Sequence, residues 1–182
     1  MKAARLLLGL LVTAAAAGAP PEPSGYRMDE YVAPTPSTLA GATVLDTDQA
    51  HLLWEQHQTV FIDVLPRPPR PAGLPASSIW RPGPRYDVPG STWLPDTGYG
   101  ALAPVMAAYF EQGLESVTAG GRAHSLVFYC KADCWMSWNA AKRAMTLGYT
   151  RVSWYPEGVD GWVAHGLPTE MREPVPRPDA TE

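Results

Sequence analysis

The chain has 182 residues, a formal net charge of −4 at neutral pH and 46% hydrophobic residues. This length predicts one globular domain with additional terminal segments, and the hydrophobic content is sufficient for a sizeable core. The acidic balance argues against nucleic acid or an anionic membrane as the main partner. The 16 glycines and 20 prolines predict long irregular connections between the regular elements.

Residues 1–19 have the organisation of a secretory signal peptide. Lys2 and Arg5 precede an apolar run from Leu6 to Val12, and small residues follow that run. The run is far shorter than the roughly 20 residues that a membrane-spanning helix needs. We therefore expect an exported, periplasmic protein with no stable membrane insertion after cleavage, in a compartment where disulfides persist.

Two further terminal segments flank the expected domain at residues 43–167. Residues 20–42 are rich in Pro, Ser and Thr and have no hydrophobic period, which predicts a linker or a segment draped over the domain. Residues 168–182 are again proline-rich, and we expect a disordered C-terminal tail there.

Within residues 43–167, hydrophobic patterns predict strands that alternate with helices. The prolines between Leu65 and Arg85 exclude a regular element from that stretch. Leu52 and Leu53 are expected to face the core from the first helix. This alternation predicts an α/β fold with a central parallel sheet flanked by helices, and ligands at the carboxyl ends of the strands. The expected strands lie at 43–45, 59–65, 88–94 (after a turn), 125–129 and 151–155, and the expected helices at 46–56, 102–115 and 137–147.

Both cysteines of the chain, Cys130 and Cys134, lie in one short loop between a strand and a helix. Backbone N–H groups and the helix dipole in such a loop favour a thiolate, which is the reactive form of cysteine. A four-residue offset also allows a disulfide, and closing so small a ring removes little chain entropy. We interpret the pair as a redox switch, a resolving couple or a soft-metal site; the alternatives are an inert core thiol at Cys130 and a plain loop staple.

Five sequence features occur in this order: Phe61-Ile62-Asp63-Val64, Val88-Pro89-Gly90-Ser91, Val127-Phe128-Tyr129-Cys130, Gly148-Tyr149, and Glu157-Gly158 with Gly161-Trp162. This order is typical of a rhodanese domain, and the chain from about residue 43 to 166 resembles that family. The resemblance implies a persulfide-carrying Cys130 and a structural Asp63 that ties loops above the sheet. Asp133 would oppose a thiolate at Cys130 and repel an anionic donor such as thiosulfate, and Lys131 offsets it only partly.

The cysteine loop also resembles the PQQ-dependent catabolism-associated CXXCW motif family, here with three residues between the cysteines. The segments Pro89–Pro95 and Gly98–Gly100 extend the similarity. The resemblance implies a bacterial periplasmic protein associated with alcohol oxidation by pyrroloquinoline quinone (PQQ) enzymes. The loop side chains expected at the site are Lys131, Ala132, Asp133, Trp135 and Met136.

Three functions stay open from the sequence. The first is a rhodanese-type sulfurtransferase in which Cys130 takes sulfane sulfur and Cys134 releases it. The second is a thiol–disulfide redox or sensing protein. The third is a non-enzymatic accessory that binds Cu(I) or a redox cofactor for a PQQ-dependent dehydrogenase or a cytochrome c. We rank sulfur or thiol chemistry above metal binding.

The aromatic and histidine side chains near the loop have simpler expected roles. We expect Trp138 to pack in the core and Trp135 to cover the cysteine loop rather than to form a cofactor platform. His124 and His165 have no ligand spacing to the cysteines, so exposed or capping positions are expected and no metal site is assigned to them.

Overall fold

The computed structural model describes residues 18–75, 77–80 and 85–177. Apart from residues 18 and 19, the predicted signal peptide lies outside the described residues. Within the described ranges, no helix has the length and apolar character that a membrane crossing requires.

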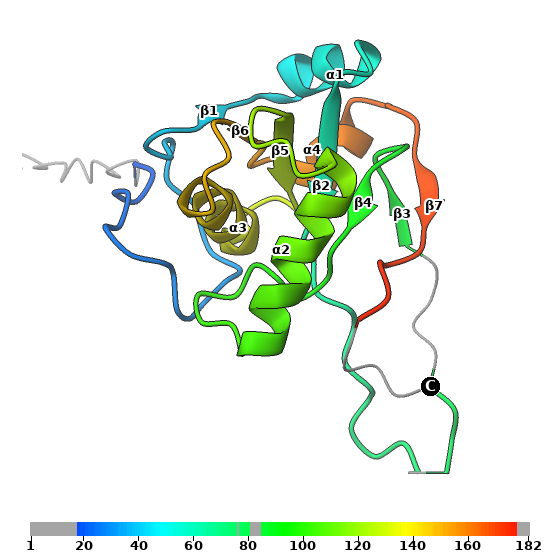
Figure 1. Cartoon of the computed structure of the whole chain (residues 1–182). Coiled ribbons are helices and arrows are strands. Elements are labelled where there is room, and N and C mark those ends of the chain that lie inside the picture. The colour runs from blue at the N-terminus through cyan, green and yellow to red at the C-terminus, as the bar shows by residue number, and fades with distance from the viewer. Residues whose placement is uncertain (1–17, 76, 81–84, 178–182) are drawn as a thin grey trace, which may run out of the picture.

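A five-stranded sheet forms the centre of the protein (Figure 1). All of its neighbouring strands are parallel, so their carboxyl ends share one edge. Asp63 at the end of β2 lies opposite Tyr129 at the end of β5, directly before Cys130. The strand order is β1 (Thr43–Val44), β6 (Arg151–Trp154), β5 (Ser125–Tyr129), β2 (Thr59–Asp63) and β4 (Thr92–Trp93).

In the described part of the chain, four helices cover the two faces of this sheet, which confirms the predicted α/β class with a central parallel sheet flanked by helices. Helices α2 (Pro104–Thr118) and α3 (Trp135–Thr146) supply side chains to the core on one face. Helices α1 (Thr47–Glu55) and α4 (Gly158–Ala164) supply them on the other. The predicted start of α1 is correct: Asp46 accepts the Gln49 N–H at 2.8 Å, and the Gln49 side chain accepts the Asp46 N–H in return.

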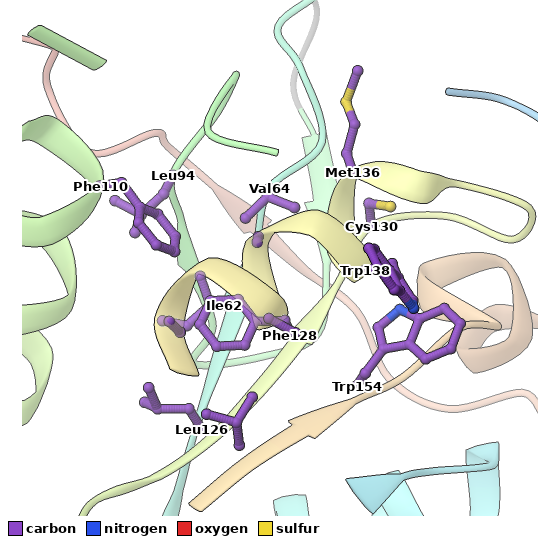
Figure 2. Close-up of a cluster of buried hydrophobic side chains, with 14 of the residues drawn as sticks. Ile62, Val64, Leu94, Phe110, Leu126, Phe128, Cys130, Met136, Trp138 and Trp154 are labelled. Carbon is purple, nitrogen blue, oxygen red and sulfur yellow. The ribbon is translucent and has the colours of Figure 1, made fainter. Parts of the chain in front are cut away.

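Side-chain alternation along β5 determines where the first cysteine points. Leu126 and Phe128 face the core beneath α2 and α3, whereas Val127 and Tyr129 face the opposite core. Because successive strand residues point to opposite faces, Cys130 continues the row of Leu126 and Phe128. Figure 2 shows Cys130 in that buried cluster, next to Trp138 of α3.

The structure corrects one prediction for α1 and adds elements that the sequence analysis did not assign. Leu52 is 56% exposed, so its predicted inward orientation is wrong; Ala50 is the apolar residue of α1 that is buried. Helix α4 is an addition. A two-stranded antiparallel ribbon of β3 (Arg85–Asp87) and β7 (Glu170–Arg172) is another.

The ribbon also changes the interpretation of the C-terminal segment. Residues 168–177, expected as part of a disordered tail, include β7, and Pro174 forms a bridge with Trp93 of β4. The Val175 N–H donates to the Trp93 carbonyl at 2.9 Å. An extended proline-containing segment can satisfy the open edge of a sheet, and here it satisfies the edge of β4. Residues 178–182 lie outside the described part of the chain.

Candidate functional site

The two cysteines of the loop are joined in a disulfide. Cys130 follows the last residue of β5, and Cys134 is the N-cap residue of α3, with a Cα–Cα distance of 6.5 Å. Both residues are almost fully buried, with exposed fractions of 0% for Cys130 and 2% for Cys134. The structure therefore joins the two predicted residues and buries both of them.

The polar backbone groups around the sulfur differ from the predicted cradle of amides. The Cys130 Sγ lies 3.5 Å from the carbonyl oxygen of Cys134 and 3.8 Å from that of Lys131. Two loop amides point elsewhere: Ala132 donates to Asp160 of α4 at 3.2 Å, and Trp135 donates to the Tyr31 carbonyl. Carbonyl dipoles disfavour an anion, so this arrangement suits a neutral disulfide better than a thiolate.

An N-terminal strap, which we define as residues 26–39, covers the cysteine loop. Its Val32 forms an antiparallel bridge with Cys134. The Ala33 N–H donates to the Asp133 carbonyl at 2.9 Å, and Tyr31 accepts the Trp135 N–H at 2.9 Å. The strap thus adds a short strand-like contact directly over the second cysteine.

Two tryptophans of α3 hold the rest of the strap through its backbone. The indole N–H of Trp135 donates to the Pro34 carbonyl, and that of Trp138 donates to the Thr38 carbonyl, both at 3.1 Å. The two rings contact each other edge to face with a centroid distance of 5.5 Å. Trp138 is completely buried, and Trp135, at 3% exposure, lies over the loop.

Asn139 of α3 is a clamp that the sequence analysis did not identify. Its Nδ2 donates to the carbonyls of Arg27 at 2.9 Å and Gly98 at 3.0 Å, and its Oδ1 accepts the Arg27 N–H at 2.9 Å. The Arg27 guanidinium also lies 5.3 Å from the centre of the Trp135 ring. The sequence signal for this clamp was an amide residue on a mostly apolar helix face, because a buried amide side chain needs several hydrogen-bond partners.

The remaining predicted loop residues differ in their exposure. Lys131 is half-buried and pairs through its backbone with Gly158, while Asp133 is exposed. Asp133 has a left-handed φ of +51° at the tip of the turn. Met136 is buried against Gly98, where a Cβ atom would come within 2.4 Å of the Met136 Cβ.

Asp63 lies in a buried polar cluster at the carboxyl ends of β2 and β5. Its carboxylate accepts the Leu65 N–H at 2.9 Å and the Arg85 Nε at 2.6 Å. Arg85 Nε also lies 3.3 Å from Asp87, which accepts the Tyr129 hydroxyl at 2.7 Å. Burial, followed by the neighbouring Asp87 carboxylate, raises the pKa of Asp63 well above its usual value. Arg85 and Asp87 were not predicted, because their strand forms only through pairing with the distant β7.

The histidines take local roles. His124 Nδ1 lies 3.0 Å from the Gly121 carbonyl, and His165 Nδ1 lies 2.9 Å from the Gly161 carbonyl; both residues are exposed. In the ranges that the structure covers, no three or more His, Cys, Asp or Glu side chains are grouped so that they could hold a metal ion.

Comparison with solved structures gives the same fold class. A complex of an EanB variant with hercynine matches 78% of this chain and 34% of its own, at 21% identity and a TM-score of 0.50. The polysulfide-sulfur transferase homodimer from Wolinella succinogenes matches 74% of this chain and 82% of its own, at 20% identity and a TM-score of 0.43. Thiosulfate sulfurtransferase from Pseudomonas aeruginosa matches 73% of this chain and 21% of its own, at 15% identity and a TM-score of 0.47.

These similarities concern the fold alone, because the sequence identities are low. No protein-family model and no curated protein matches the sequence. The chain is thus an α/β protein with a central parallel sheet and a covered Cys130–Cys134 disulfide at the carboxyl edge of that sheet.

Proposed function

We propose that this chain is a thiol-redox protein of the rhodanese-like class, with Cys130 as the sulfur that accepts and releases other sulfur atoms. The observation that carries the proposal is the bond between Cys130 and Cys134 in the loop after β5. In parallel α/β proteins, ligands bind at the carboxyl ends of the strands, which is where this loop lies. With a sequence separation of 4, the bond supplies only about 2 kcal/mol in the loop-closure treatment. Stabilisation is therefore a minor role for it.

The surroundings of the pair support a disulfide as the resting state. The carbonyls of Lys131 and Cys134 near the Cys130 sulfur are compatible with a neutral disulfide and unfavourable for a thiolate. Reduction therefore comes first. An external dithiol attacks the pair, becomes oxidised to its own disulfide, and passes two electrons and two protons to Cys130 and Cys134.

Sulfur transfer follows from the reduced pair. The Cys130 thiolate attacks the outer sulfur of a donor such as thiosulfate; the sulfur–sulfur bond of the donor breaks and sulfite leaves. Cys130 then carries a persulfide. The Cys134 thiolate attacks the Cys130 sulfur, the outer sulfur leaves as hydrosulfide, and the disulfide is restored. The electrons for releasing hydrosulfide are those that the dithiol supplied.

Access to the pair requires movement of the N-terminal strap. Val32 lies against Cys134, and the strap carbonyls are held by Trp135 and Trp138. Since both sulfurs are buried, a donor cannot reach them in the closed arrangement. The strap therefore protects the pair from unselective thiols, and its opening limits the rate of reduction.

Intact-mass measurement tests this function. The protein is reduced, freed of reductant, incubated with thiosulfate, and compared with the Cys130→Ser and Cys134→Ser variants. The proposal expects one added sulfur on Cys134→Ser, none on Cys130→Ser, and hydrosulfide release with a return to the disulfide mass in the wild type. A reversible two-hydrogen change without sulfur uptake limits the function to thiol–disulfide exchange.

The cellular setting is a second part of the proposal and rests on the sequence. The signal-like residues 1–19 support export to the periplasm, and the Cys130–Met136 loop supports an association with PQQ-dependent alcohol oxidation. The partner in this proposal is a PQQ-dependent dehydrogenase or a cytochrome c. The molecular mass of the protein recovered from the periplasm of a bacterial host tests the proposed export. Affinity capture by a purified quinoprotein dehydrogenase tests the proposed partner.

A further inference from the structure

A second cavity lies beyond the carboxyl end of β2. A cleft of about 580 Å³ opens between the segment that follows β2 and the start of α2. It is separate from the disulfide, since neither Cys130 nor Cys134 lines it. Its size is within the range of pockets that hold small organic molecules.

Two arginines and one carboxylate give this cleft a net positive charge. Arg177 donates to Asp96 at 2.7 Å, and Arg67 also interacts with Asp96 through its charge and its backbone N–H, so two guanidinium groups share one carboxylate. The Arg67 Nε is buried and has no hydrogen-bond partner among the residues that the structure describes. A buried guanidinium N–H without a partner is unfavourable, and an anion in the cleft would satisfy it.

The remaining walls are apolar or carry no competing charge. Leu102, Met106 and Tyr99 line the cleft together with prolines of the segment after β2. Ala103, the N-cap residue of α2, also lines it and provides no side-chain cap. The 15-residue α2 therefore presents its positive dipole end to the cleft without a side chain that neutralises it.

The part of the wall that Tyr99 forms is held in place before any ligand binds. Arg143 of α3 donates to the carbonyls of Thr97 at 2.8 Å and Tyr99 at 2.7 Å. The Tyr99 ring contacts Tyr31 of the strap with a centroid distance of 5.2 Å. A wall fixed on both sides does not need to be ordered by the ligand, which favours binding.

We propose that this cleft binds a small organic monoanion, a carboxylate with an apolar body, whose charge is held by Arg67 and whose body contacts Leu102 and Met106. The carboxylate accepts from Arg67, and the prolines and Tyr99 exclude water around the apolar part. Binding at this site does not depend on the redox state of the cysteines, so its test is independent of the proposed sulfur chemistry.

Benzoate is a suitable probe, with benzamide as its neutral counterpart of similar shape. Two-dimensional NMR of the full chain is recorded during titration up to about 20 mM, a range that detects millimolar dissociation constants. We expect saturable shifts at the amides of residues 96–103 with benzoate and none with benzamide. Arg67→Met removes the cation and keeps the backbone of that position.

The matched control is Arg70→Met in the same proline-rich segment, because Arg70 is exposed and does not line the cleft. Arg67→Met is expected to weaken benzoate binding by at least about tenfold, as for loss of a charged hydrogen bond, while Arg70→Met leaves it unchanged. Absence of saturation in the wild type, equal binding of benzamide, or equal affinity in Arg67→Met would each overturn the proposal.

Discussion

Val32 and Cys134 lie opposite each other in an antiparallel bridge, so the segment before the domain is paired directly with the second cysteine. The two flanking hydrogen bonds, Ala33 to Asp133 and Trp135 to Tyr31, are each 2.9 Å long. The state of the strap and the exposure of the disulfide are therefore linked.

Ala33→Pro should accelerate reduction of the disulfide. Proline has no N–H, so the bond to the Asp133 carbonyl is lost and the strap opens more often. Loss of one hydrogen bond at about 1 kcal/mol corresponds to a roughly fivefold faster reduction by a dithiol. The rate of disulfide reduction is measured by stopping the reaction with an alkylating reagent and determining the masses of the products by mass spectrometry. Ala33→Ser keeps the N–H and serves as the control; equal rates in all three proteins would contradict the role of the strap.

Asn139→Ala should lower the free energy of unfolding by about 3 kcal/mol, since one buried and two partly buried hydrogen bonds lose their partner. Denaturant unfolding followed by tryptophan fluorescence measures this change. Thr146→Ala on the exposed end of the same helix is the control and should stay within about 0.5 kcal/mol of the wild type. A similarly small effect of Asn139→Ala would mean that the clamp does not stabilise the fold.

The buried Asp63 should make stability depend on pH. The pKa of Asp63 is raised in the folded protein, so its favourable contribution is complete below the unfolded pKa of about 4 and is lost as pH rises through the folded pKa. Asp63→Asn does not titrate at this position. The stability difference, wild type minus Asp63→Asn, should therefore fall from acidic toward neutral pH. Urea unfolding at several pH values checks this, and two parallel curves would contradict it.

Asp133→Asn should increase the rate at which thiosulfate modifies the reduced protein. The change removes an exposed negative charge from the loop, and asparagine tolerates the left-handed backbone at this position. Coulomb repulsion at an exposed site predicts an increase of about threefold at low salt that disappears at high salt. Asp29→Asn on the strap is the control for total charge. An unchanged rate at low salt would show that Asp133 does not repel the donor.

The sequence predicted the parts of the fold that depend on local patterns. The strand at Ser125–Tyr129 was found with its observed bounds, and the helix expected at 46–56 begins where the structure places the N-cap residue Asp46. Gly148, with a φ of +89°, lies directly after residue 147, where the expected helix ends. The seven-residue α4 was missed because Gly158 and Gly161 resemble turn residues.

The parts that depend on distant pairing could not be predicted in the same way. Strands β3 and β7 have three residues each and form only against one another. The strap has no hydrophobic period, and its contacts use backbone carbonyls, which carry no signal in the residue types. The cysteine pair was predicted as a site. Its burial was not predicted, because the strap covers the pair and also accepts the backbone N–H of Trp135.

Redox titration of the folded protein tests the central claim most directly. The protein is equilibrated in dithiol and disulfide buffers of defined potential, and free thiols are then alkylated. Mass spectrometry gives the fractions of reduced and oxidised protein, and circular dichroism is recorded in parallel. We predict a reversible two-electron transition between the disulfide and the dithiol with the fold retained, at a potential above the roughly −300 mV below which structural disulfides lie. A bond between Cys130 and Cys134 that resists reduction until the protein unfolds would contradict this account and leave it a structural link.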